Sequence, residues 1–144
     1  MDNLVKFFVA PDDASARSAL QAGPGRGVES VSFSYVDPGA AVVKWECLLI
    51  GGNFVERIEA GEPRYIVAGF YDGPIVFEVP PPLTAALADA AHSRLSDVAA
   101  TWSFDLAERG EFIDPEAVDE VMKGLAALAS SAQRQNQSVY CWAA

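Results

Sequence analysis

Apolar positions recur along the chain with two periods, and the period predicts which segments are strands and which are helices. Over residues 28–36, serines alternate with Val31, Phe33 and Tyr35, and this period of two is typical of a half-exposed strand. Apolar residues three and four apart predict helices instead. Strands are expected at residues 4–9, 28–36, 64–71, 74–79 and 139–142. Helices are expected at residues 12–21, 38–50 and 83–91, from residue 93 onward, and at 115–134, with a polar connection or short helix at 53–62.

Aspartate, proline and glycine mark the boundaries of these elements. Asp37-Pro38 and Asp114-Pro115 each combine an N-cap residue with a proline at the first helical position, and Gly51-Gly52 ends the helix that begins at Pro38. Asp72-Gly73 is a turn signal that predicts a hairpin between the third and fourth strands. The two helices on either side of His92 are close enough in sequence to form one kinked unit.

The segment at residues 38–50 is apolar nearly all round, with Lys44 and Glu46 as its two charged residues. A helix of this kind is usually buried, so we expect it to lie at the centre of the fold. Together the elements predict one α+β domain spanning residues 1–144. Its sheet, mixed or mostly antiparallel with about five strands, is expected to pack against the central helix and the C-terminal helices.

The composition changes the functional picture more than the structural one. With 20 acidic and 10 basic residues among 144, the formal net charge is −10. Nucleic acids and anionic membranes are bound by basic surfaces, so we expect neither as a ligand. The first apolar run is interrupted by Lys6 and is too short for a signal peptide, which indicates a cytoplasmic protein without a membrane span.

Glu46 is the residue with the most unusual predicted setting, because it falls on an apolar side of the central helix. A carboxylate there is costly unless it is paired, and an unpaired one has a raised pKa. A salt bridge or hydrogen bond to Arg64, Arg57 or a strand end is favoured over a functional role. If Glu46 is functional instead, a pocket is expected beside it. The candidate pocket residues are Glu46, Trp45, Tyr35 and Trp142.

Other chemical motifs are weak or absent in the sequence. The glycine loop at residues 22–27 leads from a helix into a strand, which is the wrong order for a phosphate-binding loop. His92 is the single histidine and is favoured as a solvated or capping residue over a general base. Cys47 and Cys141 have apolar neighbours and are expected in the core. We therefore predict no catalytic residue, metal or cofactor, and whether the chain is an enzyme stays open, with a non-enzyme favoured.

Two segments resemble a known family. The run Asp37-Pro38-Gly39-Ala40 leads into a tryptophan-containing helix that ends in Leu48-Leu49-Ile50-Gly51-Gly52, and the closing helix carries Leu125-Ala126-Ala127-Leu128-Ala129 before a short terminal strand. Both features resemble the YfbM-like family of small bacterial proteins. The resemblance implies an α+β fold and no established activity, and it transfers no functional residue.

Two functions compete on these observations. Acidic residues are concentrated between residues 105 and 120, and such a surface favours a basic protein as partner, so the first hypothesis is a non-catalytic interaction module of the immunity or regulator type. The candidate acidic face consists of Asp105, Glu108, Glu111, Glu116, Asp119 and Glu120. The alternative is a small-molecule-binding protein, or an enzyme without a recognisable motif, with a pocket near the central helix. Part of the acidity complements the dipole of the last helix, and solubility alone would account for the rest.

Overall fold

The computed structural model describes residues 4–20, 23–25, 28–35, 37–67 and 74–144, which form five strands and six helices. The strands are β1 (Leu4–Ala10), β2 (Ser30–Ser34), β3 (Arg64–Val67), β4 (Ile75–Glu78) and β5 (Ser138–Ala143). The helices are α1 (Asp13–Arg17), α2 (Pro38–Ile50), α3 (Phe54–Glu59), α4 (Pro81–Asp89), α5 (His92–Glu108) and α6 (Pro115–Arg134).

All five strands form one antiparallel sheet in the order β2-β1-β5-β4-β3. The strand nearest the C-terminus, β5, lies in the middle, where Cys141 pairs with Phe7 of β1 on one side and with Phe77 of β4 on the other. The expected α+β class and antiparallel sheet are confirmed. The strand order was not predictable, because pairing between β1 and β5 joins residues 128 to 138 positions apart.

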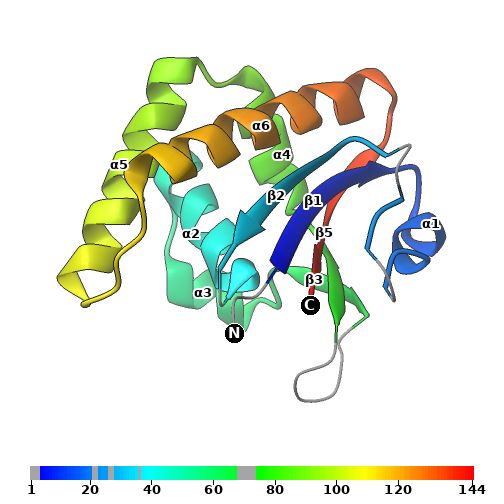
Figure 1. Ribbon diagram of the computed structural model, residues 1–144, viewed down its shortest axis with the longest axis horizontal. Coiled ribbons are helices and arrows are strands. Elements are labelled where there is room, and N and C mark those ends of the chain that lie inside the picture. The colour runs from blue at the N-terminus through cyan, green and yellow to red at the C-terminus, as the bar shows by residue number, and fades with distance from the viewer. Residues whose placement is uncertain (1–3, 21–22, 26–27, 36, 68–73) are drawn as a thin grey trace.

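The helices cover the two faces of this sheet unequally (Figure 1). One face is covered by α2, α4, α5 and α6, and the main core lies between them and the sheet. On the other face a smaller cluster forms under α1, with Phe8, Tyr140 and Trp142 among its members. Because side chains alternate along a strand, successive residues of β5 belong to different clusters. Cys141 therefore packs in the main core, whereas Trp142 packs in the smaller cluster on the other face of the sheet.

The central helix α2 has the predicted bounds. Asp37 caps it, with Oδ1 accepting from the Ala40 N–H at 3.0 Å, and Gly51 ends it with a φ of +88°. Its buried residues include Val42, Val43 and Trp45, all with no exposed surface, as expected for a helix with apolar residues on most sides. α6 also begins and ends where predicted, capped by Asp114.

Other elements differ from the prediction in length or continuity. α4 and α5 are two separate helices, as expected, and the alternative of one kinked unit around His92 does not occur, because Ala90 and Ala91 have extended backbones with ψ of 136° and 153°. Within the described residues, β2 covers Ser30–Ser34 of the predicted 28–36, and the part of the expected 12–21 helix up to residue 20 is helical only at α1. The polar connection after α2 contains the short helix α3. β3 and β4 pair as a hairpin, but the predicted turn at Asp72-Gly73 lies outside the described residues.

Candidate functional site

Glu46 lies on α2 with no exposed surface, and its partner is Arg57 of α3. The Nη1 group of Arg57 donates to Glu46 Oε2 at 2.5 Å and lies 3.8 Å from Glu62 Oε2. Its Nη2 group donates to the Gly51 carbonyl at 2.7 Å, which closes the turn between α2 and α3. The favoured expectation of an ion pair is thus met by Arg57, while Arg64 binds elsewhere.

One guanidinium serves two carboxyl groups in this cluster, so the charges are not balanced. Among the described residues, Glu46 Oε1 and Glu62 Oε2 have no hydrogen-bond donor. Burial and the neighbouring Glu62 carboxylate raise the pKa of Glu46 to about 7, although Arg57 lowers it. A proton held by Glu46 near neutral pH relieves both the burial of charge and the repulsion between the two acids.

The predicted pocket is in part a packed aromatic cluster. Trp102 of α5 makes edge-to-face contacts with Trp45 at a ring-centroid distance of 5.3 Å and with Tyr35 at 5.1 Å. Phe33 packs against all three rings. Trp45 is completely buried, so of the predicted pocket residues Trp45 and Glu46 offer no surface to a ligand.

A small cavity does exist next to this cluster, and Tyr35 is the predicted pocket residue that reaches it. Its volume is about 70 Å³, and it lies where the end of β2 meets α2, α3 and α5. Its walls are formed by Tyr35, Ala40, Ala41, Lys44, Phe54, Trp102, Leu106 and Arg109. A pocket near α2 was expected from the sequence, but Lys44 and Arg109 were not among its predicted residues. Lys44 could have been recognised as the single cation on an otherwise apolar helix.

Trp142 is not part of that region, because it lies on the opposite face of the sheet. Its Nε1 group donates to the Leu20 carbonyl at 2.8 Å, and its ring packs beside Gly23. The prediction grouped Trp142 with Trp45 and Tyr35 since all are aromatic. Alternation along β5 directs the Trp142 side chain away from them.

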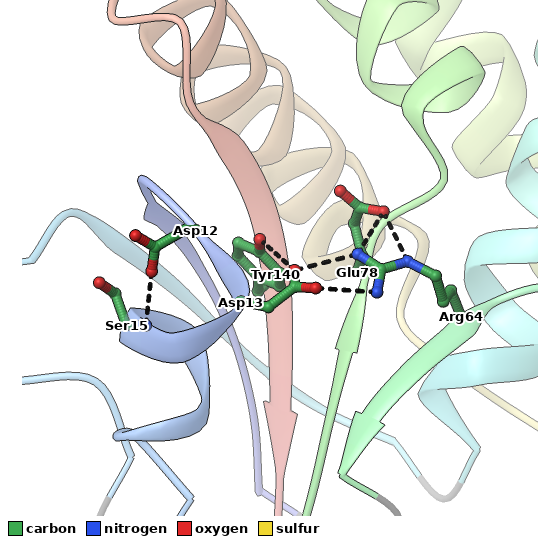
Figure 2. A network of polar contacts seen from close by, with 6 residues as sticks. All are labelled: Asp12, Asp13, Ser15, Arg64, Glu78 and Tyr140. Carbon is green, nitrogen blue, oxygen red and sulfur yellow. Dashed lines mark hydrogen bonds and ion pairs between the residues drawn. The ribbon is translucent and has the colours of Figure 1, made fainter.

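The α1 face contains its own polar network, drawn in Figure 2. The Arg64 guanidinium donates to both carboxylate oxygens of Asp13 at 3.0 Å and to Glu78 Oε1 at 3.1 Å. The Tyr140 hydroxyl donates to Asp13 Oδ1 at 2.8 Å. Hydrogen bonds from Arg64 and Tyr140 lower the pKa of Asp13, and burial together with Asp13 raises the pKa of Tyr140. Each group has a partner, so this network reads as an anchor of α1 to the sheet.

The six predicted acidic residues do not form one continuous patch. Asp119 Oδ1 accepts from Ser96 Oγ at 2.7 Å, and Oδ2 accepts from Lys123 Nζ at 2.8 Å. These two hydrogen bonds lower the pKa of Asp119. Ser96 is in the first turns of α5, about 13 Å along the helix from Asp105 at the usual rise per residue. Asp119 therefore lies apart from the C-terminal end of α5 and its carboxylate is already partnered.

The remaining acidic residues divide between two places. Glu116 and Glu120 are exposed in the first turns of α6, and Glu120 also lines a groove of about 540 Å³ between α6 and β2. Asp105, Glu108 and Glu111 lie at the end of α5 and in the segment after it, which Figure 1 shows at the periphery, away from the sheet. Glu108 and Glu111 are exposed and Asp105 is half-buried.

Two phenylalanines occur among the carboxylates at that end. Phe104 is 64% exposed and Phe112 is 90% exposed. These two phenylalanines were not among the predicted site residues. The exposure of Phe104 could have been recognised, because Phe104 is two residues from Trp102 and so lies about 200° around the helix from the apolar side. We refer to Phe104, Asp105, Glu108, Glu111 and Phe112 as the α5 tip.

The other candidate residues have simple environments. His92 is exposed at the first residue of α5. Both cysteines are free thiols, and burial raises the pKa of Cys141 well above its ordinary value, which makes it a poor nucleophile. No group of three or more potential metal ligands occurs within the described ranges. In the same part of the chain, no helix combines the length and hydropathy that crossing a bilayer requires.

Comparisons with protein-family models, with curated proteins and with solved structures found no match to this chain. The resemblance to the YfbM-like family therefore stays a prediction from two sequence segments.

Proposed function

We propose that this protein is a non-catalytic interaction module that binds a basic protein partner through the α5 tip. The cytoplasm remains the proposed location of the protein. Nucleic acids and anionic membranes are not expected as ligands, because the net charge of −10 would repel both. Glu116 and Glu120 at the start of α6 form a second acidic area, separate from the tip.

The exposure of Phe112 and Phe104 is the observation that carries the proposal. Burying a phenylalanine side chain is worth about 1.5–3 kcal/mol, so leaving two of them in water forgoes a substantial stabilisation. α5 has access to the core, since Trp102 and Leu106 are buried on the side of the helix opposite Phe104. Aromatic side chains with a charged rim are typical of protein-binding surfaces, where the aromatic residues contribute most of the affinity.

The charges at the tip determine which partners approach. Asp105, Glu108 and Glu111 lie between the two phenylalanines in the sequence, and Arg109 is the single cation in that segment. A basic partner is attracted by this surface and by the net charge of the whole molecule, whereas acidic proteins are repelled. The expected partner surface is therefore basic with an apolar depression that receives an aromatic ring.

Affinity capture at low and high salt tests this proposal. The immobilised protein should retain a basic protein at about 0.05 M salt and release it at about 0.5 M, because screening weakens attraction between exposed charges. A Phe104→Ser, Phe112→Ser double variant should retain at least tenfold less of the same protein. Val55→Ser is a matched control, since Val55 is 58% exposed on α3, away from the tip sequence.

Two results would contradict the proposal. One is the failure to retain any basic protein at low salt. The other is equal retention by the wild type and the double phenylalanine variant, which would show that the tip is not the binding surface. Circular dichroism of the double variant checks that its fold is intact, and both replaced side chains are mostly exposed, so no loss of stability is expected.

A further inference from the structure

The cavity beside α2 has walls of unusual composition for this protein. Of its eight wall residues, Ala40, Ala41, Phe54, Trp102 and Leu106 are apolar. The remaining three are Lys44, Arg109 and Tyr35. Both charged wall residues are thus cationic, although acidic residues outnumber basic ones by two to one in the chain as a whole.

The two cations are available to a ligand. In the part of the chain that the structure describes, neither Lys44 nor Arg109 takes part in an ion pair or a side-chain hydrogen bond. By contrast, Arg57, Arg64 and Lys123 all have carboxylate partners. An ammonium group and a guanidinium group that share one cavity wall can both donate hydrogen bonds to the same anion.

Tyr35 adds a neutral donor to this wall. Burial and the nearby carboxylates of Glu111 and Asp37 raise the pKa of Tyr35, so its hydroxyl keeps its proton at neutral pH. Asp37 Oδ1 is occupied by the Ala40 N–H as the cap of α2. The two carboxylates leave the mouth of the cavity less positive than Lys44 and Arg109 alone would make it.

We propose that this cavity binds a small monocarboxylate, with the carboxylate group held by Lys44, Arg109 and the Tyr35 hydroxyl and a short apolar tail against Trp102, Phe54 and Leu106. The proposal does not rest on the α5 tip as a docking surface, although Arg109 and the tip residue Glu111 are close to the cavity.

Size and charge narrow the ligand class. A single water needs about 10–15 Å³ of such space, so a cavity of about 70 Å³ accepts a ligand of about four to six non-hydrogen atoms. The apolar floor favours an aliphatic tail over a fully polar anion such as phosphate. Glu111, Asp37 and the net charge of −10 disfavour a second negative charge on the ligand. Butyrate meets all three conditions.

Equilibrium binding of butyrate to the purified protein tests the proposal, followed by calorimetry and by tryptophan fluorescence, since Trp102 lies in the wall. Butyrate should bind saturably at millimolar concentration or below. n-Butylamine has nearly the same size and the opposite charge, and it should not bind. Succinate and inorganic phosphate should bind at least tenfold more weakly than butyrate, which separates a monocarboxylate site from a general anion site.

Single replacements then locate the site. Lys44→Gln and Arg109→Gln should each raise the Kd for butyrate about tenfold or more, as expected when a charge-assisted hydrogen bond is lost. Arg134→Gln removes a cation from the exposed end of α6 and should leave the Kd unchanged. The absence of saturable binding, equal binding of butyrate and n-butylamine, or wild-type affinity in both cavity variants would each overturn the proposal. None of these outcomes bears on the retention of a basic protein by the α5 tip.

Discussion

Glu46 has no exposed surface on a helix whose other fully buried residues are apolar, and it remains there because Arg57 reaches it from the next helix. The pair is not isolated, since Glu62 approaches the same guanidinium. Burial of a charged group is costly, and a second acid nearby adds to that cost. The protonated form of Glu46 is therefore favoured in the folded protein, and its pKa is raised to about 7.

This shift makes stability depend on pH. The pKa of Glu46 rises from 4.5 to about 7 on folding, so the folded state binds the proton more tightly. Its contribution to stability is complete below pH 4.5 and is lost as the pH rises through 7. Glu46→Gln has no such proton. The unfolding free energy of the variant minus that of the wild type should therefore increase by up to about 3 kcal/mol between pH 4.5 and about pH 8.

Urea denaturation across this pH range measures the difference between the two proteins. Glu59→Gln is the control, because Glu59 is exposed on α3, and its difference from the wild type should change little with pH. A pH-independent difference between Glu46→Gln and the wild type would show that Glu46 is charged throughout, with Arg57 outweighing burial and Glu62.

Gly51 and Gly52 follow one another after α2, but we expect different costs for replacing them. Both have positive φ, +88° and +106°, so alanine is strained at either position by about 1–3 kcal/mol. A Cβ atom at Gly52 would also lie 2.6 Å from Nη2 of Arg57, whereas one at Gly51 meets no atom within 4 Å. Gly52→Ala should therefore displace Arg57 from Glu46 and lower the unfolding free energy by at least about 1 kcal/mol more than Gly51→Ala does.

Thermal and urea denaturation of the two alanine variants provide the comparison. The variants share the same chemical change at adjacent positions, so each is the control for the other. Equal losses of stability would mean that the Arg57 side chain moves aside without cost and that the ion pair does not depend on Gly52.

At the scale of elements, the sequence predicts best what is determined locally. The bounds of α2 and α6 follow from Asp37-Pro38 and Asp114-Pro115, because a cap and a proline at the first helical position act within one turn. Two helices were expected around His92 and two are found, but the sequence left one kinked unit open as an alternative, since Ala90 and Ala91 are good helix formers.

The anchoring of α1 is another element-scale feature that the sequence conceals. This helix has five residues, too few to be stable alone, and Tyr140 of β5 and Arg64 of β3 hold it through Asp13 (Figure 2). Tyr140→Phe removes one of these hydrogen bonds while Arg64 keeps Asp13 in place. We expect it to lower the unfolding free energy by about 1 kcal/mol.

Urea denaturation checks this loss, with Tyr65→Phe as the control because Tyr65 is 45% exposed. Amide hydrogen exchange in α1 should also be faster in Tyr140→Phe than in the control, since the helix is less firmly attached. If the two variants lose equal stability and exchange alike, the hydrogen bond from Tyr140 to Asp13 does not hold α1.

At the scale of the whole molecule, the predictability of the candidate site depended on distance in the sequence. The shortlist of partners for Glu46 contained the right residue, Arg57, because α3 follows α2 closely. Trp142 was grouped with the wrong aromatic residues, because its face of the sheet depends on the register of β5. The cavity itself joins Tyr35, Lys44 and Arg109 from three separate segments, and only the fold brings them together.

The central position of β5 also has a consequence for the order in which the protein folds. The pairs β1–β2 and β3–β4 can each form early, because their strands are neighbours in sequence. Neither pair contacts the other through strand hydrogen bonds until residues 138–143 enter between them. A ribosome must therefore have released residue 143 from its exit tunnel before the sheet can close, and until then the nascent chain contains two strand pairs with unpaired edges.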